Sequence, residues 1–265
     1  MTDEAFQIIS HDDASRWLLT ADHASNRIPN WVNGGSLGLP DADMNRHIAY
    51  DPGSRGLTLA LAEHLNARAI TSNFSRLVID PNRGIDDPTV LMKLYDGSVI
   101  QGNRSAGDAE RQERLDRLWR PYHDALETLA MATPDTAICA IHSFTPQLKG
   151  RPRRPWQVGV LFSYDERLSR PFIDLMTADR EFAEWVEHQT GERLCIGENE
   201  PYGGHLDGDS IDQHALRHGR LNILIELRND LIETEEQQRA WAAKLAPILS
   251  AALEAADRAA GHKGH

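Results

Sequence analysis

Short apolar runs and longer helical patterns alternate along most of this 265-residue chain, and this alternation constrains the fold more than any other feature. The short runs predict strands, and stretches with apolar residues three and four positions apart predict helices. The predicted strands are 17–21, 69–71, 77–80, 136–141, 158–163, 193–196 and 222–227. The predicted helices are 54–66, 108–131, 170–190 and 233–259. This order is typical of a three-layer αβα fold, with helices on both faces of a mostly parallel central sheet.

The length of the chain suits one large α/β domain, and we expect residues 1–265 to form a single domain with a substantial core. Two stretches, 30–43 and 84–107, are rich in Gly, Pro, Asn and Asp and are predicted to be loops. The second is long for a loop in a compact domain. Such loops are usually functional or mobile, so we expect it to form a lid or a substrate rim.

The charge of the chain argues against binding to nucleic acid. The net charge is −12, whereas nucleic-acid-binding surfaces normally show a basic stripe. The only dense basic stretch, Lys149 to Arg154, reads as a solvated loop containing proline, with attraction of an anionic substrate as the alternative. The sequence therefore favours a small-molecule partner, and it does not indicate an oligomeric state.

The two cysteines and the N-terminal residues bear on location. Cys139 and Cys195 lie in apolar stretches without CxxC spacing, which indicates neither a disulfide framework nor a thiolate zinc site. The first residues are acidic, and no run reaches the roughly 18 apolar residues of a membrane-spanning helix. We expect a soluble, cytoplasmic protein that does not bind membranes.

A carboxylate interrupts the apolar run 222–227 at Glu226. An ionised glutamate on a central strand costs several kcal/mol unless a partner compensates for its charge. His23 directly follows the strand 17–21, and His142 follows the strand 136–141. Because the carboxyl ends of parallel strands meet at the edge where open α/β sheets bind ligands, we expect these three side chains to lie together.

Histidine and carboxylate are the residue types that metal-dependent hydrolysis requires. Catalytic zinc is generally held by three protein ligands of these types, with water in the open position, and a nearby glutamate can take the proton of that water. His23, His142 and Glu226 therefore predict a metal-assisted hydrolase.

A series of short motifs, in order along nearly the whole chain, resembles the N-formylglutamate amidohydrolase family, within the zinc-carboxypeptidase-like hydrolases. The motifs are Asp22-His23-Ala24-Ser25-Asn26 with Ile28-Pro29, Asp51-Pro52-Gly53, the stretch from Ser75-Arg76 to Asp80-Pro81-Asn82-Arg83, Ile141-His142-Ser143-Phe144-Thr145-Pro146, Arg154-Pro155-Trp156 with Gly159-Val160-Leu161, Asn199-Glu200-Pro201-Tyr202, and Ile225-Glu226-Leu227-Arg228. The resemblance implies a zinc-carboxypeptidase-like (phosphorylase/hydrolase-like) fold and one divalent metal, with zinc as the expected ion.

The resemblance also implies roles for the metal-site residues. His23 and His142 resemble the two metal-binding histidines, and Glu226 resembles the catalytic glutamate that activates water. Arg76 is a candidate for stabilising the oxyanion.

Four further residues are candidates for binding substrate. Asn82 and Arg83 resemble the Asn-Arg pair that grips a substrate carboxylate, and an arginine fork suits a carboxylate better than lysine does. Tyr202 is a candidate phenol on the substrate side. Arg228 lies two residues beyond Glu226 and is predicted to pair with substrate or with Glu226, a structural ion pair being the alternative.

The third metal ligand is open. The position three residues after His23 is Asn26, where the carboxypeptidase motif has glutamate. An amide oxygen can bind zinc but is neutral, so Asp22 ranks equally with Asn26, and Asp51 ranks behind them. Asp22 is also a candidate for orienting His23 without binding the metal itself.

The activity that we predict is hydrolysis of the amide of a small N-acyl amino acid of the N-formyl type, such as N-formylglutamate. One alternative keeps the metal site but changes the substrate to another acylated amino acid or a cell-wall peptide. A closed pocket near Arg83 would favour the small substrate, and an open groove would favour the polymer. A second alternative, motivated by Asn26, is a catalytically inactive ligand-binding homologue.

Overall fold

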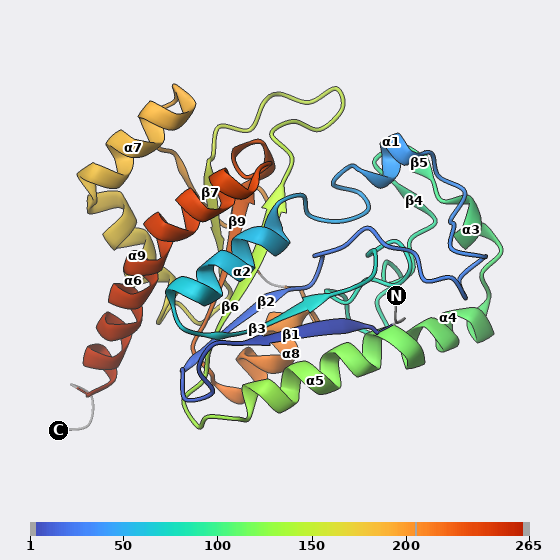
Figure 1. Cartoon of the computed structure of the whole chain (residues 1–265), viewed down its shortest axis with the longest axis horizontal. Helices are drawn as coiled ribbons and strands as arrows, with labels where there is room; N and C mark the ends of the chain where they lie inside the picture. Colours follow the sequence, from blue (N-terminus) through green and yellow to red (C-terminus); the bar gives the residue numbers. More distant parts are fainter. Residues whose placement is uncertain (1–3, 205, 262–265) are drawn as a thin grey trace.

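One sheet organises the computed structural model, which describes residues 4–204 and 206–261 (Figure 1). The sheet has seven strands in the order β1-β3-β2-β6-β9-β7-β8. Their bounds are β1 Phe6–Ser10, β2 Trp17–Ala21, β3 Arg68–Ser72, β6 Ala137–Phe144, β7 Val158–Leu161, β8 Ile196–Glu198 and β9 Asn222–Arg228. The central strands β3, β2, β6 and β9 are parallel, while β1 and β7 run antiparallel to their inner neighbours and β8 follows β7. The prediction of a mostly parallel sheet is confirmed.

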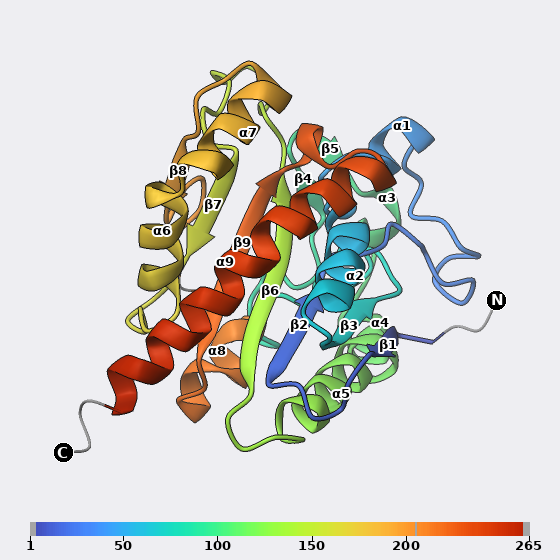
Figure 2. The same cartoon turned by 60° about the vertical axis from the view of Figure 1, so that its left-hand side comes forward.

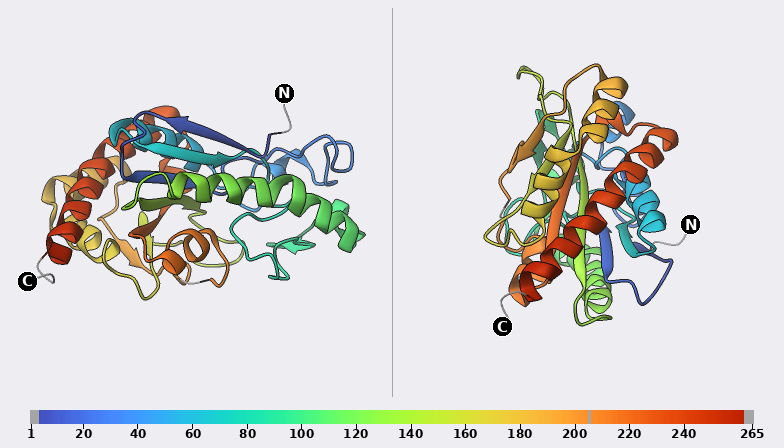
Figure 3. Two further views of the ribbon diagram at one scale, coloured as in Figure 1. Left: turned by 90° about the horizontal axis from the view of Figure 1, so that it is seen from below. Right: turned by 90° about the vertical axis from the view of Figure 1, so that its left-hand side faces the viewer.

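Helices cover both faces of the sheet (Figures 2 and 3). One face carries α2 Ser54–His64, α6 Ser169–Ala178, α7 Arg180–Thr190 and α9 Glu235–Gly261. The other carries α5 Arg120–Ala130 and the short α8 Ser210–His214. α5 continues α4 Asp108–Arg114 and the π-helical turn η1 Leu115–Trp119, whose apolar residues belong to a separate cluster. Along β6, Cys139 and Ile141 pack towards the first face and Ile138 and Ala140 towards the second, as the alternation of a strand requires. The three-layer architecture is confirmed.

A loop-rich lobe with its own apolar core extends beyond the carboxyl ends of the central strands. Its short elements are α1 Asp41–Met44, β4 Leu94–Tyr95, β5 Ser98–Val99 and α3 Gln101–Arg104. The stretch 77–80, predicted as a strand, lies in this lobe and forms none. Side chains replace the missing sheet partner, since Asn103 donates to the Leu77 carbonyl at 2.7 Å and Arg114 donates to the Val78 carbonyl at 2.9 Å.

Other boundaries differ from expectation for local reasons. The predicted helix 170–190 is two helices, because the extended residue Asp179 ends α6 and its side chain caps α7 by accepting from the Phe182 amide at 2.9 Å. The edge strand β1 was not predicted, since its side chains are mostly exposed and lack an apolar run. The remaining short elements are the 3₁₀ helices η2 Leu216–His218 and η3 Asn229–Leu231.

Within the described residues, no helix combines the length and apolarity needed to cross a membrane.

The register of three neighbouring strands places Glu226 in the middle of the sheet. Glu226 on β9 is opposite His142 on β6 and opposite Gly159 on β7. A Cβ added to Gly159 would lie 2.3 Å from the Glu200 carbonyl oxygen and 3.2 Å from Glu226 Cβ. The absence of a side chain at this position therefore permits the close packing around Glu226.

Replacement of Gly159 by alanine is expected to lower the free energy of unfolding by about 1–3 kcal/mol, because the backbone must move to relieve overpacking. Denaturant unfolding measures this change. Gly107→Ala is the control, since an added Cβ at Gly107 meets no atom within 4 Å. Equal stability of the two variants would contradict the packing argument.

Candidate functional site

Side chains from the carboxyl ends of β2, β6 and β9 meet in one cavity of about 330 Å³. His23 follows β2, His142 and Glu226 lie near the ends of β6 and β9, and all three line this cavity. Asp51 joins them from the turn before α2, where its amide donates to the His23 carbonyl at 2.9 Å. The sheet edge that the sequence indicated is thus the floor of a pocket.

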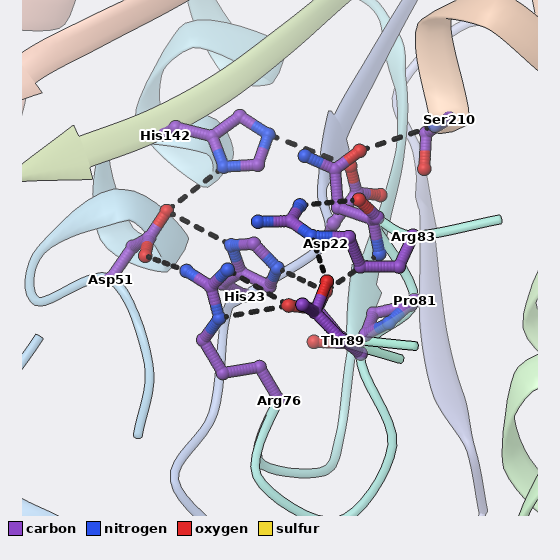
Figure 4. A network of polar contacts seen from close by, with 12 residues as sticks. Asp22, His23, Asp51, Arg76, Pro81, Arg83, Thr89, His142 and Ser210 are labelled. Atoms are coloured by element: carbon purple, nitrogen blue, oxygen red, sulfur yellow. Dashed lines mark hydrogen bonds and ion pairs between the residues drawn. The ribbon is translucent and has the colours of Figure 1, made fainter. Parts of the chain in front are cut away.

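His23, Asp51 and His142 form a compact buried cluster (Figure 4). Asp51 Oδ2 is 3.3 Å from His23 Nδ1 and 2.9 Å from His142 Nδ1. One possible ligand atom from each residue lies within 4.8 Å of the others, and the side chains are only 2–5% exposed. Two imidazoles and a carboxylate are a ligand set typical of catalytic zinc.

Further carboxylates face the outer nitrogens of both histidines. Asp80 Oδ1 is 2.8 Å from His23 Nε2, and Asp22 Oδ2 is 3.5 Å from His142 Nε2. Tyr122 donates a hydrogen bond to Asp22. Metal-binding histidines commonly donate their second ring N–H to a carboxylate, which fixes their orientation. Asp22 thus lies beside His142 in the position of an orienting group.

The electrostatics of the cluster favour positive charge. Burial lowers the pKa of His142, yet the neighbouring carboxylates of Asp22 and Asp51 hold that pKa well above its ordinary value. Burial raises the pKa of Asp51, but His23 and His142 bring it far below the ordinary range. The donor atoms and the surrounding charge therefore fit a divalent cation.

Glu226 is buried in the same pocket, and its Oε2 has no hydrogen-bond partner among the described residues. Burial is the main cause that raises the pKa of Glu226 to about 8. The Asp51 carboxylate adds to this rise, whereas His142 opposes it. A buried carboxyl group with a free oxygen and a strongly raised pKa is typical of functional sites.

The structure brings the other predicted residues to this pocket except Asp22, Asn26 and Arg228. Arg76, Asn82, Arg83 and Tyr202 all line it. Arg76 donates to Asp80 Oδ2 through Nε and Nη2 at 3.1 and 2.8 Å, and its Nη1 lies 3.7 Å from Asp51 Oδ1.

Two of the candidate substrate-binding side chains, Arg83 and Tyr202, can donate hydrogen bonds to a substrate. Arg83 donates to Thr89 and to the Asn82 carbonyl, which leaves its Nη2 without a hydrogen bond to any described residue. Tyr202 is 41% exposed at the rim, and burial of its hydroxyl raises its pKa to about 12. The phenol of Tyr202 therefore remains protonated near neutral pH.

Asn26 is a correction to the predicted metal set. Its Nδ2 donates to the Met44 carbonyl at 2.9 Å and to Asn45 Oδ1 at 3.2 Å, and it lines a different surface hollow. The turn after His23 directs Asn26 away from the histidines, whereas the backbone bond to His23 holds Asp51 beside them. Asp51, ranked last from the sequence, is the carboxylate between the two rings.

Arg228 is a second correction. Its guanidinium is 1% exposed and donates to Glu192 Oε2 at 2.7 Å and to Asp230 Oδ1 at 2.8 Å. It does not line the pocket. The position of Arg228 matches the structural ion pair that was the alternative reading, although its partners are Glu192 and Asp230 rather than Glu226.

Three polar residues were missed or assigned elsewhere. Asp80 was quoted in a motif but given no role, although its place before Pro81-Asn82-Arg83 was the available signal. His123 is buried and contacts His214 at 2.8 Å and the Pro81 carbonyl at 2.8 Å. Tyr122 carries no sequence signal, since it lies on an ordinary amphipathic helix.

Comparison with known proteins identifies relatives of this chain. The family model described as N-formylglutamate amidohydrolase matches residues 15–233. An N-formylglutamate deformylase from Pseudomonas putida is 29% identical over 123 residues, which are 41% of this chain and 43% of that protein. A deformylase of the same name from Pseudomonas aeruginosa is 28% identical over 120 residues, 40% of this chain and 42% of that protein. The matched part thus spans less than half the length of these curated relatives.

Two solved structures are similar over nearly their whole length. A gene product from Agrobacterium tumefaciens has 32% sequence identity and a TM-score of 0.85, with 96% of each chain covered. An N-formylglutamate amidohydrolase from Ralstonia eutropha has 21% identity and a TM-score of 0.62, with 96% of this chain and 97% of that chain covered. The second likeness supports the fold alone.

Proposed function

Because the chain belongs to the N-formylglutamate amidohydrolase family, we propose that it is a metal-dependent hydrolase that cleaves the amide bond of a small N-acyl amino acid of the N-formyl type. The observation that carries this proposal is the buried group His23, Asp51 and His142 with the free carboxyl of Glu226 in the same cavity. N-formylglutamate, named for the curated relatives, is the reference member of this substrate class.

His23, Asp51 and His142 would hold the metal, which we propose to be zinc. When bound, such an ion polarises the amide carbonyl and makes a nearby water more acidic. Asp80 and Asp22 keep the two imidazoles oriented through their outer nitrogens. The ligand set of this proposal replaces Asn26 with Asp51.

Glu226 performs the proton transfers. It accepts a proton from the attacking water as the water oxygen bonds to the acyl carbon. It then donates that proton to the amine nitrogen as the C–N bond breaks, which gives a carboxylic acid, formate for a formyl substrate, and a free amino acid. His142 already opposes the rise in the pKa of Glu226, and a bound divalent ion would lower that pKa further, which suits a base near neutral pH.

Two arginine side chains stabilise negative charge, one on the oxygen of the reacting amide and the other on the substrate carboxylate. The Nη1 group of Arg76 is available for the oxygen that becomes negative, because Asp80 holds the rest of the guanidinium in place. Arg83, with its free Nη2, and Asn82 bind the substrate carboxylate. Tyr202 donates a hydrogen bond to the substrate from the rim of the pocket.

The size of the cavity supports a small substrate over a polymer. A volume of about 330 Å³ lies at the lower end of the range for ligand pockets, roughly 300–1,000 Å³. Asp51 also offers the carboxylate that Asn26 lacks, which supports an active enzyme over an inactive homologue.

Zinc-loaded protein is expected to release formate from N-formyl amino acids, and a chelator is expected to abolish this turnover until zinc is restored. A coupled formate assay, with metal content measured on the same samples, tests the proposal. N-acetyl and N-succinyl amino acids define the acyl range. Folded, zinc-loaded protein that releases no acyl product from any of these compounds would refute it.

A further inference from the structure

An apolar wall lines the pocket beside Glu226. It consists of Leu161 at the end of β7, Leu206 in the loop before α8, and Leu224 on β9. Leu161 and Leu224 are opposite each other in the sheet. These three residues are called the leucine wall below.

The leucine wall is within reach of a substrate held at Glu226. Leu224 lies two residues before Glu226, so both side chains are on the same face of β9, about 7 Å apart along the strand. A small amino acid whose acyl group lies at Glu226 can therefore place its own side chain against these leucines.

The positively charged side chains that line the pocket can pair with one substrate carboxylate. Among the described residues that line it, Arg76 and Arg83 are the only lysine or arginine side chains, and Arg76 pairs with Asp80 and keeps its Nη1 for the oxygen of the reacting amide. Arg154 lies outside the lining, donates to the Thr145 carbonyl and to Tyr202, and stacks against the Tyr202 ring. Arg83 remains for the carboxylate next to the scissile amide.

An acidic side chain lines the same pocket as the leucine wall and Asn82. Asp209 lines the pocket, and the amide of the next residue, Ser210, donates to Asn82 Oδ1 at 3.1 Å. Burial raises the pKa of Asp209 to about 6, so most of this group is still negatively charged above pH 7. A second substrate carboxylate near Leu206 would be repelled by Asp209 and would find no further lysine or arginine among the described residues that line the pocket.

We infer that the side-chain subsite of this pocket selects apolar N-formyl amino acids, such as N-formyl-leucine, over N-formylglutamate. The leucine wall buries an apolar side chain, whereas burial of an unpaired second carboxylate is unfavourable. The inference rests on the proposed function for the class of ligand, and it concerns binding rather than hydrolysis. Its failure is therefore separable from failure of the proposed reaction.

The first test measures dissociation constants by calorimetry with zinc-loaded Glu226→Gln protein at pH 7.5. The probes are N-formyl-leucine, N-formylglutamine and N-formylglutamate, and the glutamine compound separates charge from shape. We expect N-formyl-leucine to bind at least about tenfold more tightly than N-formylglutamate, with N-formylglutamine between them. Equal or tighter binding of N-formylglutamate, or binding of none of the three, would overturn the inference.

Hydrolysis of the same probes by the parent protein separates the two proposals. Selective binding of N-formyl-leucine without turnover of any probe would retain the inference and refute the proposed hydrolysis. Turnover of N-formylglutamate, together with binding of N-formylglutamate that is as tight as or tighter than that of N-formyl-leucine, would retain the reaction and refute the inferred selectivity.

The second test changes the wall itself. Leu206 is half-buried in a loop, so Leu206→Lys can place a cation in the subsite, and Leu206→Gln is the uncharged control of similar size. We expect the lysine variant to shift the affinity ratio towards N-formylglutamate by about tenfold or more, and the glutamine variant to shift it less. An equal shift in both variants would contradict the placement of the substrate side chain at Leu206.

Discussion

Replacement of Glu226 by glutamine is expected to lower kcat for amide hydrolysis by about 10²–10⁴-fold while the metal content stays unchanged. The amide keeps the shape of the side chain but cannot accept the proton of the attacking water. Glu226 is outside the His23, Asp51 and His142 group, so its replacement removes no proposed metal ligand. Turnover and metal stoichiometry measured on the same preparation test both parts.

Glu198→Gln is the matched control for this change. Glu198 lies on β8 of the same sheet, but it is exposed and pairs with Arg170 at 2.9 Å. The control is expected to retain turnover within about twofold of the parent, because changes on an exposed surface usually have small effects. Near-normal hydrolysis by Glu226→Gln would exclude Glu226 as the base.

Glu226→Gln is also expected to change how the stability of the metal-free protein depends on pH. Burial raises the folded-state pKa of Glu226 to about 8, above the ordinary value of 4.5. The folded state therefore binds more protons than the unfolded state between these pH values, and stability falls as pH rises through this window. Since glutamine cannot ionise, we expect metal-free Glu226→Gln to be more stable than the parent at pH 8 and to show a flatter pH dependence.

The residues that could be predicted from the sequence are those whose position follows from strand ends. His23, His142 and Glu226 each end or interrupt an apolar run, and parallel strands bring their carboxyl ends to one edge. The strand pattern therefore specified both the sheet and three of the chemically important side chains.

Asp51 could not be ranked from the sequence because its position depends on a tertiary contact. Asp51 is 28 residues from His23 along the chain, and the hydrogen bond from its amide to the His23 carbonyl places it. The motif spacing instead favoured Asn26, which a turn of the local backbone directs to Met44 and Asn45.

Arg228 and the stretch 77–80 show the same limit of local patterns. The alternation along β9 places Arg228 on the face of Glu226, but its long side chain reaches Glu192 and Asp230 instead of the cavity. The apolar residues of 77–80 read as a strand, yet distant side chains satisfy their carbonyls within the loop-rich lobe. Glu192 for Arg228, and Asn103 and Arg114 for the stretch 77–80, are partners far away in the sequence that the local pattern does not contain.

Replacement of Asp51 by alanine is expected to weaken zinc binding by more than about 100-fold, and turnover is expected to disappear with the metal. Loss of a group that only orients a ligand typically costs 10–100-fold in affinity, and loss of a charged ligand should exceed this. Without Asp51, the histidines also lose the carboxylate that faces both Nδ1 atoms. Competition with a chromophoric chelator measures the affinity.

Asn26→Ala and Asp22→Asn separate the three candidates for the third ligand. Asn26 bonds only to Met44 and Asn45 among the described residues, so its alanine variant should bind zinc within about threefold of the parent, a change of under 1 kcal/mol. Asp22→Asn should weaken zinc binding by about 10–100-fold, because Asp22 orients His142 without lying in the His23, Asp51 and His142 group. If Asn26→Ala loses the metal while Asp51→Ala keeps it, the ligand set proposed from the geometry is wrong. If Asp22→Asn matches Asp51→Ala instead, Asp22 itself binds the metal, and His142 must turn its Nε2 rather than its Nδ1 towards the ion.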